Sequence, residues 1–343
     1  MFNPKFIITG SLLANIKRIT TLIQQLNNQR YPKLVLLEYE RVARAVSAYA
    51  STSIEGNPLP LTEVKKILKS HPSYIRNSEQ EVINYNQALE TLDELLKAKP
   101  IDITLGLILS IHKQITDKLL PTYETGKLRQ KPVVVNDPRS GNVVYLPPDV
   151  DMVNRLMDEL VEFVTKSTEM IDPLILAGIF HKQMVIIHPF MDGNGRTTRL
   201  VTKVLLAKMG LNTFNLFSFE NYYNQNVTKY FQMVGETGDY NDLKDEIDFT
   251  NWLQYFTDGI IDELLRIQNS LPMYNMSPTT RLEVHHEAIL RHIKSKGLIT
   301  DREYATFTIR SKATRALDFN RLIMLNLIER KGKGRSTYYT LKG

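Results

Sequence analysis

The sequence of 343 residues contains no cysteine, which excludes a disulfide framework and any metal site built on thiolates. Long apolar runs are missing too, since no stretch approaches the roughly 18 apolar residues of a membrane span. The first residues, MFNPKFIITGSLL, lack a basic region and a small-residue cleavage pattern, so we predict no signal peptide. These absences predict a cytoplasmic protein without membrane contact.

Acidic and basic residues nearly balance along the chain, except near the C-terminus. The net charge is +6, but residues 275–343 hold 14 Lys and Arg against 6 Asp and Glu, which makes this segment +8. The rest of the chain is slightly acidic. This asymmetry predicts a separate basic domain that is suited to an acidic partner.

The apolar residues recur at helical spacing along most of the chain, which predicts a mainly α protein. Its length exceeds that of most single cores. We predict an N-terminal helical region (1–100), a central core (101–270) and a C-terminal domain (275–343) behind a linker at 271–281. The predicted helices of the first two parts are 11–29, 34–50, 61–69, 77–97, 103–119, 150–166, 172–187, 195–209, 219–235 and 247–270.

Residues 127–147 interrupt the helical pattern. The stretch KLRQKPVVVNDPRSGNVVYLP has β-branched runs on both sides of turn-forming residues, which predicts a β-hairpin. A lone two-stranded hairpin is marginally stable in water, so it must pack on the helices or bind another chain. The hairpin is therefore either a surface feature or a docking flap.

In the C-terminal domain we predict helices at 283–296, 300–306 and 311–325, then a hairpin around GKG. This order is that of a winged helix, which binds DNA in many proteins and other proteins in some. Basic surfaces are also often only solvated. If the domain binds DNA, the expected contacts are Lys312, Arg315 and Arg321 of the third helix and Lys331, Lys333 and Arg335 of the wing.

The stretch HPFMDGNGRTTR (188–199) concentrates reactive side chains between two predicted helices. Gly193 and Gly195 permit close backbone approach, and free N–H groups at the start of the second helix favour an anion. Arg196 and Arg199 are three residues apart and share one helix face. Together these features indicate a cradle for phosphates.

Two further side chains precede the cradle. Asp192 is a carboxylate beside the expected phosphates, where proteins commonly hold Mg²⁺. His188 is an imidazole that could accept a proton from an attacking hydroxyl. Each feature alone is weak, and we interpret His181 as a packing histidine. The ordered combination indicates nucleotidyl or phosphoryl transfer.

HPFMDGNGRTTR matches every defining position of the Fic family signature, so the chain resembles a Fic protein. The resemblance implies a Fic helical core that transfers AMP from ATP to a protein hydroxyl. It implies that His188 activates a Ser, Thr or Tyr hydroxyl, that Asp192 binds Mg²⁺ and that Phe190 anchors the loop. The implied phosphate contacts are Gly193, Asn194, Gly195, Arg196 and Arg199.

The resemblance extends beyond the signature. The hairpin at 127–147 takes the place of the family's flap, which pairs with an extended target segment by strand addition. Residues 219–231 take the place of its adenine-side helix, where Asn224 and Tyr230 are candidate ATP contacts or ordinary helix residues. The target is unidentified, and self-modification and a homodimer are open predictions.

The stretch STSIEGNP (51–58) places Glu55 where a helix should end. The GNP that follows is a stop signal, and a helix C-terminus disfavours a carboxylate unless a cation holds it. Through Ser51, Glu55 and Gly56 the stretch resembles the Fic inhibitory motif on the N-terminal side of the core. The resemblance implies that Glu55 pairs with Arg199, fills the γ-phosphate region and prevents the in-line geometry that transfer needs.

We therefore predict an autoinhibited protein adenylyltransferase that uses ATP and Mg²⁺. One alternative is removal of AMP from modified proteins, with Glu55 orienting a water molecule. Transfer of another phosphate-containing group is a variant of the same site, because the cradle does not specify the nucleotide base. An alternative of another class is a DNA-binding regulator built on residues 275–343.

Overall fold

The computed structural model describes residues 2–28, 33–70, 75–98, 101–137, 140–209, 216–270, 282–324 and 327–341. The chain divides into two compact units, one of residues 1–29 and 42–271 and the other of residues 30–41 and 272–343. The predicted N-terminal region and central core thus pack as one unit. The predicted linker at 271–281 lies outside the described residues.

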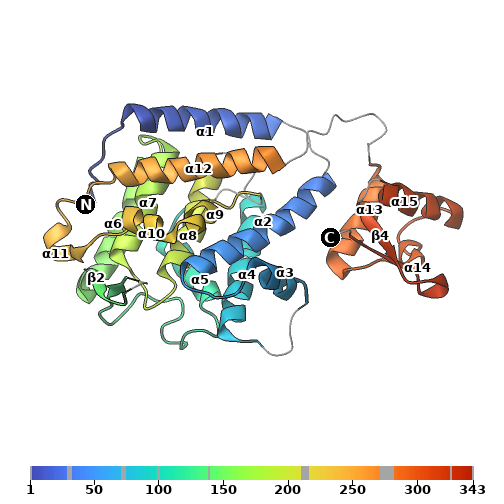
Figure 1. Cartoon of the computed structure of the whole chain (residues 1–343), viewed down its shortest axis with the longest axis horizontal. Coiled ribbons are helices and arrows are strands. Elements are labelled where there is room, and N and C mark those ends of the chain that lie inside the picture. The colour runs from blue at the N-terminus through green and yellow to red at the C-terminus, as the bar shows by residue number, and fades with distance from the viewer. Residues whose placement is uncertain are drawn as a thin grey trace. The chain divides into compact units, whose positions relative to one another are not determined.

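Unit 1 is built almost entirely of helices, as predicted (Figure 1). Its N-terminal part begins with α1 (Gly10–Asn28), which packs along α12 (Thr250–Ser270). Leu12, Ile19 and Leu26 are buried on one face of α1. The next helices are α2 (Lys33–Ile54), α3 (Leu61–Ser70), α4 (Asn77–Ala98) and α5 (Leu105–Ile115).

The centre of unit 1 is α7 (Pro173–Ile187), which is apolar on all sides and therefore buried. Pro173 occupies its first turn, and the Asp172 side chain caps it by accepting from the Leu174 N–H. Around it pack α6 (Val150–Ser167), α8 (Asn194–Ala207) and α12. None of the helices in the described ranges combines the length and apolar character needed to cross a membrane.

The predicted hairpin at 127–147 is present, with short strands β1 (Val135–Asn136) and β2 (Val143–Leu146). A third strand, β3 (Gly238–Asp239), pairs with β2 in parallel. Tyr145 is the buried residue of β2, and its hydroxyl donates to the Ile186 carbonyl at the end of α7. The hairpin is therefore attached to the helical body by a strand and by a side chain.

Two helix predictions are wrong in their extent. The helix expected at 103–119 ends at Ile115, because the chain turns there and Lys118 adopts a positive φ of 59°. The helix expected at 219–235 is two helices, α9 (Glu220–Gln225) and α10 (Val227–Val234). Asn226 leaves the helical region with φ −144° and ψ 75°, and its side chain caps α10 by accepting from the Lys229 N–H. A separate short helix, α11 (Tyr240–Leu243), precedes α12.

Unit 2 has the predicted order of three helices and a hairpin. Its elements are α13 (Val284–Lys296), α14 (Asp301–Tyr304), α15 (Lys312–Met324), β4 (Ile328–Lys331) and β5 (Tyr338–Leu341). Between the antiparallel strands lies the short 3₁₀ helix η2 (Gly334–Ser336). Phe319 and Tyr339 stack with ring centroids 4.0 Å apart, joining α15 to the hairpin.

Candidate active site

His188 is the C-cap of α7 and adopts a left-handed conformation, with φ 49° and ψ 60°. Its N–H donates to the Met184 carbonyl, and its ring Nδ1 lies 3.3 Å from the Val185 carbonyl oxygen. Burial lowers the pKa of His188 below its ordinary value, so the ring is neutral near neutral pH. A neutral imidazole at this position is able to accept a proton.

The loop between α7 and α8 is closed by its own side chains. Asn194 accepts from the Phe190 N–H at 2.9 Å and donates to the Phe190 carbonyl at 2.9 Å. Phe190 is fully buried and stacks on the His112 ring, with centroids 3.8 Å apart. The Asn194 side chain therefore shapes the loop, and only its main chain is left for the expected phosphate contact.

The two glycines bring the backbone close to other groups. Gly193 has φ 77°, which favours glycine, and a Cβ there would lie 3.1 Å from Thr116 Cγ2. A Cβ at Gly195 would lie 2.1 Å from Glu55 Oε1. The Glu55 carboxylate thus sits against the first turn of α8, where N–H groups lack acceptors within the helix.

Arg199 extends from α8 to the end of α2. Its Nε donates to Ser51 Oγ at 2.8 Å, and its NH2 group donates to the Ser51 carbonyl and to Glu55 Oε1 at 2.8 and 2.7 Å. The third nitrogen, NH1, is buried and has no hydrogen-bond partner among the described residues. Arg199 is fully buried, so a hydrogen-bond donor is left unsatisfied beside the start of α8.

Glu55 follows directly after α2, in the turn that Gly56 completes with φ 92°. The carboxylate at this helix end is held by Arg199, which is the cation that its position requires. The expected pairing of the two side chains is therefore present in the structure. The Glu55 side chain keeps 29% of its surface exposed, whereas that of Arg199 keeps none.

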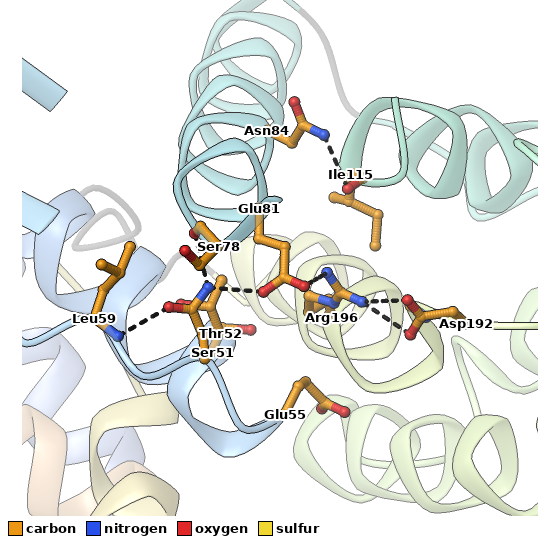
Figure 2. A network of polar contacts seen from close by, with 12 residues as sticks. Ser51, Thr52, Glu55, Leu59, Ser78, Glu81, Asn84, Ile115, Asp192 and Arg196 are labelled. Atoms are coloured by element: carbon orange, nitrogen blue, oxygen red, sulfur yellow. Dashed lines mark hydrogen bonds and ion pairs between the residues drawn. The ribbon is translucent and has the colours of Figure 1, made fainter. Parts of the chain in front are cut away.

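Arg196 belongs to a second polar network (Figure 2). Its NH2 group donates to both oxygens of Asp192, at 2.9 and 3.0 Å, and its NH1 lies 3.4 Å from Glu81 Oε1. Asn57, just after the inhibitory motif, donates to Glu81 Oε2 at 2.8 Å. Burial opposes ionisation of Asp192, but Arg196 and the Gly193 N–H outweigh it and hold its pKa below the ordinary value.

Asp192 is suited to Mg²⁺ by its position. Its side chain is 55% exposed at the rim of the loop, next to the start of α8, so its oxygens can face solvent and phosphates together. Mg²⁺ prefers one or two carboxylates together with phosphate and water oxygens. The residues present therefore fit the ion, although Arg196 would have to share the carboxylate with it.

A buried ion pair fixes α2 from the inside, and no pattern in the sequence predicted it. Glu220 accepts from Ser47 Oγ at 3.0 Å and from the Tyr85 hydroxyl at 2.7 Å. Its other oxygen lies 3.1 Å from Lys203 Nζ, and both charged side chains are at most 1% exposed. The pair joins residues from α2, α4, α8 and α9.

Tyr230, a candidate ATP contact, is buried on α10 near Arg199. It is 1% exposed, and its hydroxyl is 3.0 Å from His181 Nε2. His181 is also buried, contacts Thr202 Oγ1 at 3.0 Å, and is the packing histidine that we predicted. Arg199 is buried as deeply as Tyr230, so burial alone does not decide the matter, and an ATP contact by Tyr230 stays a prediction. Asn224 is half-buried on α9 and stays a prediction.

Two residues near the loop were missed. His112 donates through Nε2 to the Asp192 carbonyl at 3.0 Å, because its Nδ1 accepts from the Gly126 N–H at 3.0 Å. Burial lowers the pKa of His112 to about 4, so this tautomer stays neutral. Arg129 donates through Nε to the His188 carbonyl at 2.9 Å. Both contacts join residues far apart in the sequence, and no local pattern announces them.

In unit 2 the expected DNA contacts differ in availability. Arg315 is committed to Asp301 at 2.7 and 2.9 Å and to the Arg310 carbonyl, which makes it a poor candidate for phosphate or base contact. Lys331 pairs with Glu329 at 2.8 Å. Lys312 and Lys333 are exposed, Arg321 is half-buried, and the Arg335 side chain lies outside the described residues.

Comparison with known proteins identifies one domain of the chain. The Fic/DOC family model matches residues 102–206, which include α5, β1, β2, α7 and nearly all of α8. Residues 102–206 therefore form a Fic domain, which is less than half of the chain. Solved structures support the fold: a Fic family protein from Desulfovibrio desulfuricans G20 aligns with TM-score 0.67 and 21% identity, covering 100% of this chain and 99% of that one.

Relatives named as enzymes share part of the sequence. The chain is 30% identical to protein adenylyltransferase Fic of Nematostella vectensis over 166 residues, which are 47% of this chain and 37% of that one. It is 32% identical to protein adenylyltransferase fic-1 of Caenorhabditis elegans over 167 residues, 47% and 31% of the two chains. A structure of the C. elegans Fic-1 aligns with TM-score 0.60 and 23% identity, covering 76% and 72%. The chain spans only about a third of the length of these two relatives.

Proposed function

We propose that the chain is a protein adenylyltransferase that transfers AMP from ATP to a Ser, Thr or Tyr hydroxyl of a target protein or of the chain itself. The observation that carries the proposal is the convergence of His188, Asp192 and Arg199 on the start of α8. The relatives named as adenylyltransferases support the same chemistry.

The site supplies each part that the reaction needs. The N–H groups at the start of α8, with Arg196 and Arg199, bind the phosphates. Neutral His188 takes the proton of the target hydroxyl while its oxygen bonds to the α-phosphorus, and the bond to the β-phosphate oxygen breaks. The products are the AMP ester and pyrophosphate. Mg²⁺ held by Asp192 would neutralise charge on the phosphates.

In this proposal Glu55 restrains the reaction. Its carboxylate takes up Arg199 and lies over Gly195, so it competes with the terminal phosphate for the same donors. Two anions cannot share this small, buried space without strong repulsion. A triphosphate that binds around Glu55 would hold its α-phosphorus out of line with the hydroxyl.

Removal of AMP by the same site is a second candidate. The observation in its favour is that the Glu55 carboxylate is partly exposed and acts on His188, whose pKa it raises against the larger effect of burial. A carboxylate in that position is able to orient a water molecule. In that reaction Glu55 would be required, whereas in transfer it is inhibitory.

The partners remain proposals. An extended target segment would dock along β1 and β2, and the ATP base would lie near Asn224. Contact with DNA or a protein through residues 275–343 has the charge of +8 in its favour. The exposed Leu317 and Met324 of α15, at 66% and 74%, argue for a protein more than for DNA. A homodimer and a cytoplasmic location are proposals as well.

The test of the transfer proposal uses the full chain with Mg²⁺ and ATP labelled at the α-phosphate. Substitution Glu55→Gly should produce label on the chain or on proteins of a cell extract, and adding His188→Ala should remove it. Label that persists after His188→Ala would exclude His188 as the base.

A further inference from the structure

Arg129 is a buried arginine whose hydrogen bonds all go to main-chain carbonyls. It is 2% exposed and donates to the carbonyls of His188 at 2.9 Å, Pro148 at 2.5 Å and Lys131 at 3.3 Å. None of the ion pairs in the described ranges involves it. Burial lowers the pKa of Arg129, which shows that its charge is held at a cost. The positions of the three carbonyls that it binds therefore indicate what Arg129 does.

Two of the three partners bracket the hairpin. Lys131 precedes β1 and Pro148 follows β2, so one guanidinium joins both ends of the hairpin. The third partner is His188, the residue that we assign as the base. In addition, the Arg129 N–H donates to the Pro189 carbonyl at 2.9 Å. Arg129 is thus bonded to both the docking element and the reactive loop.

The conformation of His188 explains why such a contact is needed. A left-handed backbone at a residue with a side chain is strained and persists only where its surroundings fix it. The carbonyls at the end of α7 also lack helical partners. Tyr145 donates to the carbonyl of Ile186 and Arg129 to that of His188, so residues of the hairpin region satisfy both.

We propose that Arg129 is a positioning residue that couples the hairpin at 127–147 to His188. Binding of an extended segment along the hairpin would shift or steady Lys131 and Pro148, and Arg129 would pass this to the carbonyl of His188. The base then reaches its reactive orientation when a target is docked. This inference rests on the proposed function for the role of His188, but not for the contacts.

The experiment compares Arg129→Lys with Arg18→Lys, each with and without Glu55→Gly. Lysine keeps the charge but cannot hold three carbonyls in a fixed plane. Arg18 is exposed on α1, outside the hairpin and the reactive loop, so the same substitution there is a matched control. The first readout is NMR of the histidine rings, with the His188 signals assigned from His188→Ala. The second is the labelling rate against ATP concentration.

The proposal predicts that Arg129→Lys moves the His188 ring signals and their titration, while Arg18→Lys leaves both unchanged. With Glu55→Gly, the maximal labelling rate should fall about 10- to 100-fold in Arg129→Lys, with KM for ATP changed less than about 2-fold. A folded Arg129→Lys protein with the His188 signals and labelling rate of the control would overturn it.

Two further results keep the outcomes distinct. If no variant is labelled, the proposed function fails, while the ring signals of His188 still decide the role of Arg129. If Arg129→Lys does not fold, Tyr145→Phe replaces it, since it removes only the neighbouring hydrogen bond to Ile186. Unchanged His188 signals in Tyr145→Phe would then count against coupling through the hairpin.

Discussion

Arg199 and Arg129 hold the two sides of the reactive loop in different ways. On the α8 side, Arg199 is paired with a carboxylate that is partly exposed, and one of its nitrogens has no partner. On the hairpin side, Arg129 is fully engaged by carbonyls of the fold. The comparison suggests that the first arginine is available for exchange with a ligand, whereas the second is a permanent part of the frame.

The largest expected effect separates the two arginines. In the Glu55→Gly background, Arg199→Ala should lower labelling by about 10²- to 10³-fold and weaken ATP binding, because a donor to the phosphates is lost. Arg129→Lys should weaken ATP binding little. Calorimetric titration of both variants with ATP measures this difference in affinity. If both variants lost ATP affinity equally, Arg199 could not be called the ligand-binding arginine and Arg129 the structural one.

A second substitution asks whether the charge of Glu55 matters or only its volume. Glu55→Gln keeps the shape and one hydrogen-bond acceptor but removes the repulsion toward phosphate. We expect labelling to rise, by about 10-fold, and to stay below that of Glu55→Gly. Initial rates at matched ATP concentration test this order. If glutamine is as inhibitory as glutamate, exclusion by volume is the cause.

The buried His112 beside the reactive loop should make the stability of the fold depend on pH. The pKa of His112 is about 4 in the folded protein against about 6.5 when unfolded, so the unfolded state binds the proton first as pH falls. Stability should therefore decline from about pH 6.5 to about pH 4, by at most about 3 kcal/mol from this residue. Denaturant melts of wild type and His112→Asn across this range measure the share of His112. A slope that is identical in both proteins would contradict it.

The smallest effect concerns the hydrogen bond of Tyr145. In Tyr145→Phe the Ile186 carbonyl loses its donor, which should lower the free energy of unfolding by about 1 kcal/mol. ATP affinity should not change, because the contact lies on the hairpin side of the loop. A melt and an ATP titration of the same sample give both values. A change in ATP affinity would mean that the two sides are not independent.

The sequence predicted the parts of the molecule that local patterns encode. The helices of unit 1, the hairpin and the order of elements in unit 2 follow from apolar periodicity and turn residues. The ordered stretch 188–199 announced the site because its residues are close along the chain. Glu55 drew notice as a carboxylate at a helix end, and its pairing with Arg199 was implied by the resemblance of residues 51–56 to the Fic inhibitory motif.

Long-range contacts that no motif marks were out of reach. His112 and Arg129 look like ordinary residues of their segments, and only the fold brings them to the loop. The contact of Tyr230 with His181 is of the same kind, because no local pattern brings these two residues together. The break at Asn226 was missed because a capping asparagine and a helical one look alike in sequence.

The most direct test of the account is a comparison of ATP labelled at the α-phosphate with ATP labelled at the γ-phosphate, with Mg²⁺ present. Wild type, Glu55→Gly and the double variant Glu55→Gly, His188→Ala are incubated with each. We predict α-label on protein with Glu55→Gly, far less with wild type, and a loss of about 10²-fold or more in the double variant. Transfer of γ-label, or no label on any protein with Glu55→Gly, would contradict adenylylation restrained by Glu55.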